Sequence, residues 1–272
     1  MKNFLIRTLS GFIYVLLILG SIVAGPVYFS LLLFIFLIFG LSELAKIGRY
    51  RYPELRPLSM YAPAIALYIL LFYFSTTGSV YLSAALPGFL NLILIAHLFT
   101  KKDGIVFNTI GFTILPLFYL AIPLALLTYF FHLPAGREYI TKEFIVGYFI
   151  LIWLNDTFAY LTGKLFGRHH MFAAVSPNKT WEGTFGGLIF GIAGAWGLSY
   201  LSIEMDFAQW AGLAVITIIF GTFGDLFESL LKRRAGLKDS GSIIPGHGGV
   251  LDRLDSILIS SPFVFLYLYF CL

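Results

Sequence analysis

The sequence predicts an all-α, polytopic integral membrane protein with about nine transmembrane helices, a cytoplasmic N-terminus and a C-terminus outside. Composition is the first of three observations that predict this fold. Of the 272 residues, 59% are hydrophobic and only 12% are charged, whereas a soluble domain is about one-quarter charged. The apolar residues also form separate long runs along the whole chain. Finally, the Lys and Arg residues gather in alternate loops between these runs, as in membrane proteins with a defined orientation.

Nine apolar runs define the predicted helices. They fall at about residues 9–24, 27–41, 60–76, 80–99, 105–131, 144–162, 183–201, 208–228 and 257–272. Several are shorter than the roughly 20 residues that span a bilayer, so we expect the helices to extend into their polar flanks. Gly25-Pro26 indicates either a tight hairpin between two spans or a break within a re-entrant pair. Pro116 and Pro123 predict a kink in the fifth run, because each removes a helical hydrogen bond.

The positive charges give the orientation. With nine spans and a cytoplasmic N-terminus, 16 of the 18 Lys and Arg residues fall in cytoplasmic segments, and only Arg137 and Lys142 fall outside. A span count that was wrong by one would place basic loops on both sides of the membrane and remove this bias. The same orientation places the polar loops 163–182 and 229–256 in the cytoplasm, where nucleotides are found.

Composition also narrows the partners. The formal net charge of +4 comes without a soluble basic domain, which favours lipid headgroups or anionic substrates and argues against nucleic acid. Cys271 is the only cysteine, so we expect no internal disulfide and no thiolate metal site. We also expect no removable signal peptide, because cleavage after Ala24 would place the bulky Ile22 where a small residue is needed.

The chain divides into two regions. Residues 1–143 carry few polar residues within their spans, and we expect them to serve as scaffold and to contact lipid. In this region we expect Glu43 and Lys46 to form a solvated pair at a helix end. Residues 144–272 contain both polar loops and are the predicted catalytic region.

The longest polar passage, residues 229–255, reads SLLKRRAGLKDSGSIIPGHGGVLDRLD. If a helix has begun there, Asp252 and Asp255 share one of its faces and can converge on one metal ion. The passage contains a basic cluster, Lys232, Arg233, Arg234 and Lys238. Asp225, before this cluster, could supply a third oxygen ligand. A basic run beside a membrane helix is usually only a topology signal. Its combination with three acids, a histidine and a glycine-rich turn favours phosphate chemistry on a divalent metal.

Asn155 and Asp156 lie inside the sixth apolar run. A carboxylate in the hydrocarbon region is unfavourable by several kcal/mol unless it faces water or a partner. Hydrogen bonding between helices is an ordinary role for Asn155, whereas we expect Asp156 to be functional.

Ser176, Lys179 and Thr180 come directly before a helix that we expect to begin near Trp181. The amide groups of a helix N-terminus, a lysine charge and hydroxyl groups together can bind an anion. Ser-Pro followed by Thr is also an ordinary helix start, so the pattern alone leaves both interpretations open.

The polar passage resembles the signature of the phosphatidate cytidylyltransferases (CDP-diacylglycerol synthases). Its fixed positions are filled here by Ser229, Lys232, Arg233, Lys238, Asp239, Pro245, His247, Gly248, Gly249, Asp252, Arg253 and Asp255. Residues 155–160 and 176–183 are similar to two other blocks of that family. Position 178 often holds a basic residue or glycine in the family, so Asn178 is given no charge role. The resemblance covers residues from about 150 to the end of the chain.

The resemblance implies a reaction in which CTP and phosphatidic acid give CDP-diacylglycerol and pyrophosphate. It implies Mg²⁺, as one or two divalent ions or beside a second, monovalent ion. Carboxylates would bind the metal, and cations and hydroxyls would hold the phosphates. The expected catalytic residues are Asp225, Asp252, Asp255 and Lys232, of which the three aspartates are the expected metal ligands. The expected substrate-binding residues are Ser176, Lys179, Thr180, Arg233, Lys238, His247, Arg253, Asn155 and Asp156.

Two roles stay open at this point. His247 could protonate or bind a phosphate, and binding is favoured because a phosphate monoester is already largely ionised near neutral pH. Asp156 could hold a metal ion or orient Lys179.

The chief alternative function is another CTP-dependent lipid enzyme, either an ether-lipid cytidylyltransferase or a polyprenol kinase. A transporter is less favoured, because paired broken helices and internal symmetry are not evident. The expected setting is the bacterial inner (cell) membrane, with the active site on the cytoplasmic side. The expected partners are CTP, phosphatidic acid and membrane lipids, with a homodimer as one expected assembly.

Overall fold

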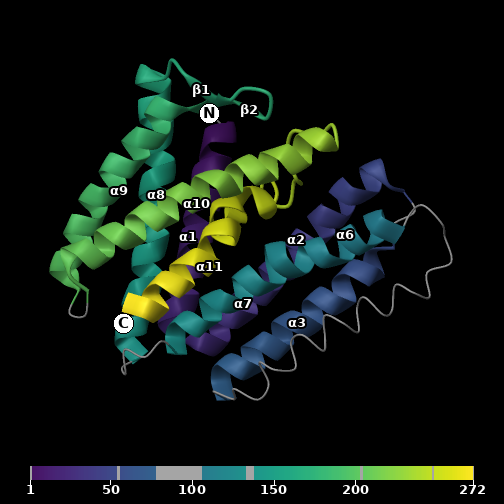
Figure 1. Cartoon of the computed structure of the whole chain (residues 1–272), viewed down its shortest axis with the longest axis horizontal. Coiled ribbons are helices and arrows are strands. Elements are labelled where there is room, and N and C mark those ends of the chain that lie inside the picture. Colours follow the sequence, from purple (N-terminus) through teal and green to yellow (C-terminus); the bar gives the residue numbers. More distant parts are fainter. Residues whose placement is uncertain are drawn as a thin grey trace.

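The protein is a bundle of long helices with a small β-hairpin at one end (Figure 1). The computed structural model describes residues 2–53, 56–77, 106–132, 138–202, 205–246 and 248–271. The helices, labelled as in Figure 1, are α1 (Lys2–Ala24), α2 (Pro26–Arg51), α3 (Pro57–Thr77), α6 (Val106–Pro116), α7 (Ile122–Tyr129), α8 (Glu138–Phe166), α9 (Trp181–Leu201), α10 (Phe207–Arg234) and α11 (Leu251–Cys271). Strand β1 (His170–Phe172) pairs antiparallel with β2 (Ser176–Thr180).

The described residues contain eight helical segments that are long and apolar enough to cross a membrane, which confirms an all-α membrane protein. They account for eight of the nine predicted runs, and the run at 80–99 lies outside the described residues. The helices extend into polar flanks as expected, because α10 continues to Arg234 and α11 begins at Leu251. Asp252 and Asp255 therefore lie on one helix. The orientation of the termini across the membrane stays a prediction.

The break at Gly25-Pro26 is a tight hairpin. Gly25, at φ +116°, separates α1 from α2, a backbone conformation that favours glycine. Ser10 on α1 bonds to Pro245, and Glu43 on α2 bonds to Ser240. The contact on α1 lies near its start and the contact on α2 near its end, so the two helices run antiparallel. Each is long and apolar enough to cross a membrane, as the hairpin alternative requires.

The predicted kink in the fifth run is a change of helix type. Leu117–Ala121 form one π-helical turn between α6 and α7, and a short 3₁₀ turn, Phe130–His132, ends the segment. Pro116 and Pro123 flank the π turn. Each proline lacks the N–H that a regular helix would use, so the hydrogen-bond ladder is rearranged there.

Helix α1 faces mostly outward. Only 11% of its apolar span, Ile6–Ala24, is buried, whereas 50% of the span in α2 is buried. Leu9, Phe12 and Leu16 are among its exposed apolar side chains. In a membrane such a surface faces lipid tails, which are as apolar as leucine.

The C-terminal helices pack in sequence, α8 on α9, α9 on α10 and α10 on α11. Helices α10 and α11 approach backbone to backbone at Gly224, where an added Cβ would lie 2.2 Å from the carbonyl oxygen of Asp255. A larger residue at 224 would hold the two helices apart. This approach brings Asp225, the next residue of α10, beside Asp255.

Gly224→Ala should separate α10 from α11, since the new methyl group overlaps a backbone oxygen. We expect a lower melting temperature in detergent, equivalent to about 1–3 kcal/mol, together with reduced activity. Gly197→Ala on α9 is the matched control, because a Cβ there meets nothing within 4 Å and alanine is the better helix former. Equal melting temperatures for the two variants would contradict the close packing at Gly224.

Candidate active site

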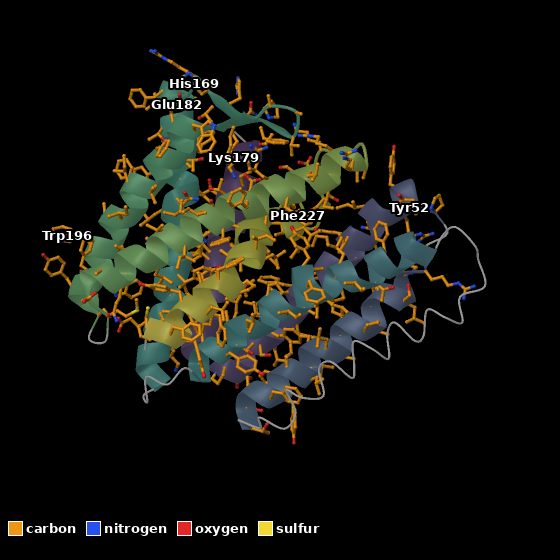
Figure 2. All side chains as sticks on the ribbon, viewed as in Figure 1. Tyr52, His169, Lys179, Glu182, Trp196 and Phe227 are labelled. Carbon is orange, nitrogen blue, oxygen red and sulfur yellow. The ribbon has the colours of Figure 1, made fainter. Side chains whose placement is uncertain are left out.

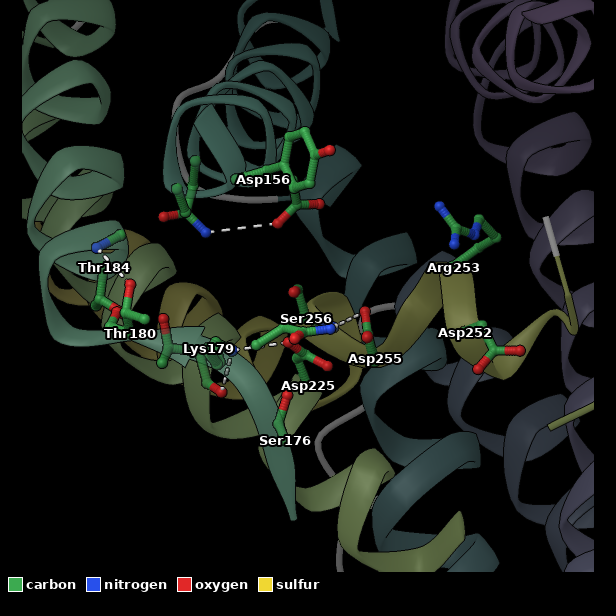
Figure 3. Close-up of a pocket in the computed structure, with 16 residues that line it drawn as sticks. Asp156, Ser176, Lys179, Thr180, Thr184, Asp225, Asp252, Arg253, Asp255 and Ser256 are labelled. Atoms are coloured by element: carbon green, nitrogen blue, oxygen red, sulfur yellow. Dashed lines mark hydrogen bonds and ion pairs between the residues drawn. The ribbon is translucent and has the colours of Figure 1, made fainter. Parts of the chain in front are cut away.

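A pocket of about 330 Å³ lies where α8, α9, α10, α11 and β2 meet (Figure 3). Asp156 lines it from α8 and Lys179 from β2, while Asp225 and Asp255 line it from α10 and α11. Both polar constellations of the sequence therefore meet in one place. Ser176 and Thr180, two further predicted binding residues, also line this pocket.

The β-hairpin positions Lys179. Its Nζ donates to Asp225 Oδ2 at 2.8 Å and to the Thr222 carbonyl oxygen at 3.0 Å, so Lys179 neutralises a carboxylate of the pocket. Thr180 is the N-cap of α9 and accepts a hydrogen bond from Gly183 N at 3.2 Å, a common way to begin a helix. The predicted helix start near Trp181 is confirmed, and residues 176–180 form a strand within the expected loop.

The open end of the hairpin, where β1 begins and β2 runs into α9, is fastened to the first turn of α9. Glu182 Oε1 lies 2.5 Å from His169 Nδ1, and Glu182 Oε2 accepts hydrogen bonds from the backbone N–H groups of Arg168 and His169 at 3.2 Å each. Figure 2 shows His169 and Glu182 together at the hairpin end, with Lys179 nearer the bundle. These contacts fix the strand that carries Lys179.

Three carboxylates gather beside the pocket. Asp225, Glu228 and Asp255 each offer an oxygen within 4.8 Å of the other two. Glu228 is 1% exposed and forms an ion pair with Lys232 through Oε2, while its Oε1 has no hydrogen-bond partner among the described residues. Oxygen ligands of this kind suit Mg²⁺ and other hard divalent cations. The cluster therefore has the donor chemistry of a metal site.

Glu228 is a candidate ligand that the sequence interpretation missed. It follows Asp225 by three residues on α10, and residues with that spacing share a helix face. The spacing was the available signal, but the apolar surroundings of Glu228 gave no indication of what it would face.

Asp252 lies at the edge of the pocket, with its carboxylate directed away from Lys179 and Asp225 (Figure 3). Its Oδ1 accepts a hydrogen bond from Lys232 Nζ at 2.6 Å. Its Oδ2 accepts from Ser240 N at 3.1 Å and from Gly249 N at 2.7 Å. In this structure Asp252 anchors the loop, and its role as a metal ligand stays a prediction.

The basic cluster is divided among different tasks. Lys232 is 9% exposed and lies between Glu228 and Asp252, so it holds α10 to the start of α11. Arg233 donates to the carbonyl oxygens of Val175 and Leu237 at 3.4 and 3.1 Å. Lys232 and Arg233 therefore stabilise the walls of the site, and neither is among the residues lining its pocket.

The other predicted binding residues occupy different positions. Asn155 and Asp156 line the pocket, and the buried Oδ1 of Asn155 has no hydrogen-bond partner among the described residues. Arg253 lines the same pocket and also a second one, which it shares with Lys238. His247 lies outside the described residues, so its role stays open.

The loop is held by a residue of the N-terminal region. Glu43 on α2 is fully buried and accepts hydrogen bonds from Val250 N, Leu251 N and Ser240 Oγ, each at 2.9 Å. The expectation of a solvated pair with Lys46 was wrong, because Lys46 is exposed whereas Glu43 is buried. Glu43 binds the N–H groups at the start of α11, where the partial positive charge of a helix favours a carboxylate.

Sequence comparisons extend the similarity to both halves of the chain. The sequence model of the cytidylyltransferase family matches residues 5–271. A phosphatidate cytidylyltransferase of Staphylococcus epidermidis is 31% identical over 262 residues, which cover 94% of this chain and 96% of that protein. The protein of the same name from Staphylococcus saprophyticus is 32% identical over 265 residues, with the same coverage. One from Staphylococcus aureus is 35% identical over 175 residues, 64% of each chain.

Glu43→Gln should loosen the loop, because the new NH₂ group must face N–H donors where an oxygen accepted them. We expect a loss of stability of about 1–3 kcal/mol, the penalty for unpaired buried polar groups, measured as thermal unfolding in detergent. Lys46→Gln, one turn away and exposed, is the control and should be neutral. Identical unfolding curves for the two variants would show that Glu43 does not hold α11.

Proposed function

The chain belongs to the cytidylyltransferase family, and we propose that it is a phosphatidate cytidylyltransferase, which makes CDP-diacylglycerol and pyrophosphate from CTP and phosphatidic acid. The observation that supports this best is the meeting of the Asp225, Glu228 and Asp255 carboxylates with Lys179 beside one pocket. Phosphoryl chemistry needs cations held close to where charge develops, and this arrangement can hold them.

The reaction joins two anions. An oxygen of the lipid phosphate attacks the α-phosphorus of CTP and forms a new P–O bond. The bond from that phosphorus to the bridging oxygen breaks, and pyrophosphate leaves with the electron pair. Because both reactants carry negative charge, they must be brought together by cations. Lys179 and Arg253 are the cationic side chains that line the pocket within the described residues.

The pocket has more carboxylates than cations. Asp156, Asp225, Asp252 and Asp255 line it, against Lys179 and Arg253. A triphosphate would be repelled from such a pocket unless a metal ion accompanied it. This excess supports Mg²⁺ as the cofactor.

We assign the metal to Asp225, Glu228 and Asp255, with Asp252 as a further candidate. A divalent ion, when bound there, neutralises phosphate charge and stabilises the leaving pyrophosphate. Lys179 bonds to Asp225, so of the two open roles for Asp156 we favour cation binding over the orientation of Lys179. Ser176 and Asn155 can then offer polar contacts to the nucleotide from the pocket wall.

We place the active site on the cytoplasmic face of the bacterial inner membrane. The segments around the site, including the starts of α1 and α9 and the end of α10, lie in parts of the chain that carry the Lys and Arg excess, and such residues favour the cytoplasmic side. CTP is supplied from the cytoplasm, which agrees with this orientation. A homodimer stays an expectation.

Purified protein in detergent should release pyrophosphate from CTP only when phosphatidic acid and Mg²⁺ are both present. Asp255→Asn should lower the rate by about a hundredfold or more, as expected when a group that stabilises the transition state is removed. Asp206→Asn is the control, since it removes a carboxylate at the far end of α10 and keeps an N-cap residue. Formation of CDP without pyrophosphate would indicate a lipid kinase. No use of CTP with any lipid phosphate would refute the enzyme assignment.

The proposed orientation places Cys271 outside and the 229–256 loop in the cytoplasm. In spheroplasts, Cys271 should react with a membrane-impermeant maleimide. Ser242 is exposed on the loop, so a Ser242→Cys substitution in a Cys271→Ser background should be reactive. Because the loop is placed in the cytoplasm, this cysteine should react only after lysis. The opposite labelling pattern would invert the topology.

A further inference from the structure

A second pocket, of about 590 Å³, shares Arg253 with the pocket of the candidate active site, which we call the acidic pocket because four aspartates line it. Arg7 of α1 and Lys238 of the loop line it together with Arg253. Among the described lining residues, Asp239 is the one carboxylate. Its volume lies within the usual range for small-molecule sites, so it has room for a phosphate and the glycerol attached to it.

The two pockets have opposite charge. The first has an excess of carboxylates and requires a metal ion before it can bind a phosphate chain. The second has three cations against one carboxylate, so it can bind a phosphate dianion directly, and Arg7 and Arg253 can each form two hydrogen bonds to it. In the described part of the chain, Arg7, Lys238 and Arg253 form no ion pair with a carboxylate. Their positive charges are therefore available to a ligand.

The position of Arg7 is fixed by contacts of α1 with the loop and with the start of α11. Ser10 Oγ donates to the Pro245 carbonyl oxygen at 2.9 Å, and Tyr14 OH donates to the Arg253 carbonyl oxygen at 3.3 Å. Gly246, at φ +77°, lies against the stem of Arg7, where an added Cβ would be 2.8 Å from Arg7 Cγ. Arg7 therefore belongs to the wall of this pocket, beyond its part in setting the topology.

The position of Arg7 along the membrane-facing helix α1 indicates which substrate the pocket serves. The helix exposes Leu9, Phe12 and Leu16 in the turns that follow Arg7. At about 100° per residue, these three side chains lie on the side of α1 opposite Arg7. Arg7 is the second residue of the apolar span Ile6–Ala24, so the pocket lies at the edge of the membrane-facing region, at the level of lipid phosphates. This level favours a phosphate that is attached to a lipid over a free nucleotide.

We propose that Arg7, Lys238 and Arg253 form the binding site for the phosphate of the lipid substrate, with the acidic pocket left to the metal-bound nucleotide. This inference rests on the proposed function. Arg253 lines both pockets, so it lies between the phosphate that attacks and the phosphorus that is attacked. Arg7 is then a substrate-binding residue from the first helix of the chain.

The test measures initial rates in mixed micelles, with phosphatidic acid varied at saturating CTP and CTP varied at saturating phosphatidic acid. Arg7→Gln should raise the apparent KM for phosphatidic acid by about tenfold or more, the value of a lost charged hydrogen bond. The KM for CTP should change by less than about twofold. Arg49→Gln is the matched control, because Arg49 is exposed near the end of α2 and lines neither pocket. A raised KM for CTP alone, or no change in either KM, would overturn the proposal.

A binding measurement keeps the test independent of turnover. Dihexanoyl phosphatidic acid without CTP should raise the melting temperature of the wild-type protein in detergent, whereas dihexanoylglycerol, which lacks the phosphate, should not. Arg7→Gln and Lys238→Gln should each lose this shift, and Arg49→Gln should keep it. A shift that persists in Arg7→Gln would refute the phosphate site. If the wild type shows the shift but forms no CDP-diacylglycerol, the pocket stands and the proposed reaction fails.

Discussion

The start of α11 is held by a buried carboxylate from α2, and the site depends on that contact. Glu43 accepts hydrogen bonds from Val250 N and Leu251 N, the first amides of the helix that carries Asp255. An added Cβ at Gly249 would lie 2.4 Å from Glu43 Oε2, so the loop can reach the carboxylate only with glycine at that position. The N-terminal helices are thus part of the active site's support, although the residues expected to do the chemistry lie in the other half of the chain. The N-terminal region is therefore a scaffold that also holds the predicted catalytic region in place.

A second constraint is the placement of charge. Carboxylates gather where α10 and α11 approach at Gly224, and basic residues gather where α1 meets the loop. The two groups meet at Arg253, which lines both pockets. In the proposed arrangement, the opposite charges of the neighbouring pockets give two anionic substrates different ways to bind, one with a metal ion and one with arginine and lysine. This separation lowers the repulsion between the substrates without requiring a single, highly charged cavity.

Neighbouring residues of the basic cluster serve different purposes because they lie on a helix and the loop after it. Successive helical residues point about 100° apart, so Lys232 is buried against Glu228 and Asp252 while Arg233 reaches the hairpin. Lys238, beyond the helix end, lies in the basic pocket. Asp252 and Asp255 likewise share a helix, yet Asp252 holds the loop, whereas Asp255 lies with Asp225 and Glu228 in a trio of carboxylates, the acidic trio. Two residues in one motif therefore make different contacts.

The sequence by itself determined the membrane helices, the signature loop and the two constellations, because a bilayer requires long apolar helices whose backbone groups are bonded within each segment. It also predicted that Asp252 and Asp255 would share a helix, since helical spacing is a local property. Only the tertiary structure decided that Lys179 pairs with Asp225, that Glu228 completes the acidic trio and that Glu43 binds the start of α11. The predicted solvated role of Glu43 failed for the same reason. Which polar groups meet depends on how the helices pack, and residues as far apart as 43 and 251 carry no local pattern that records it.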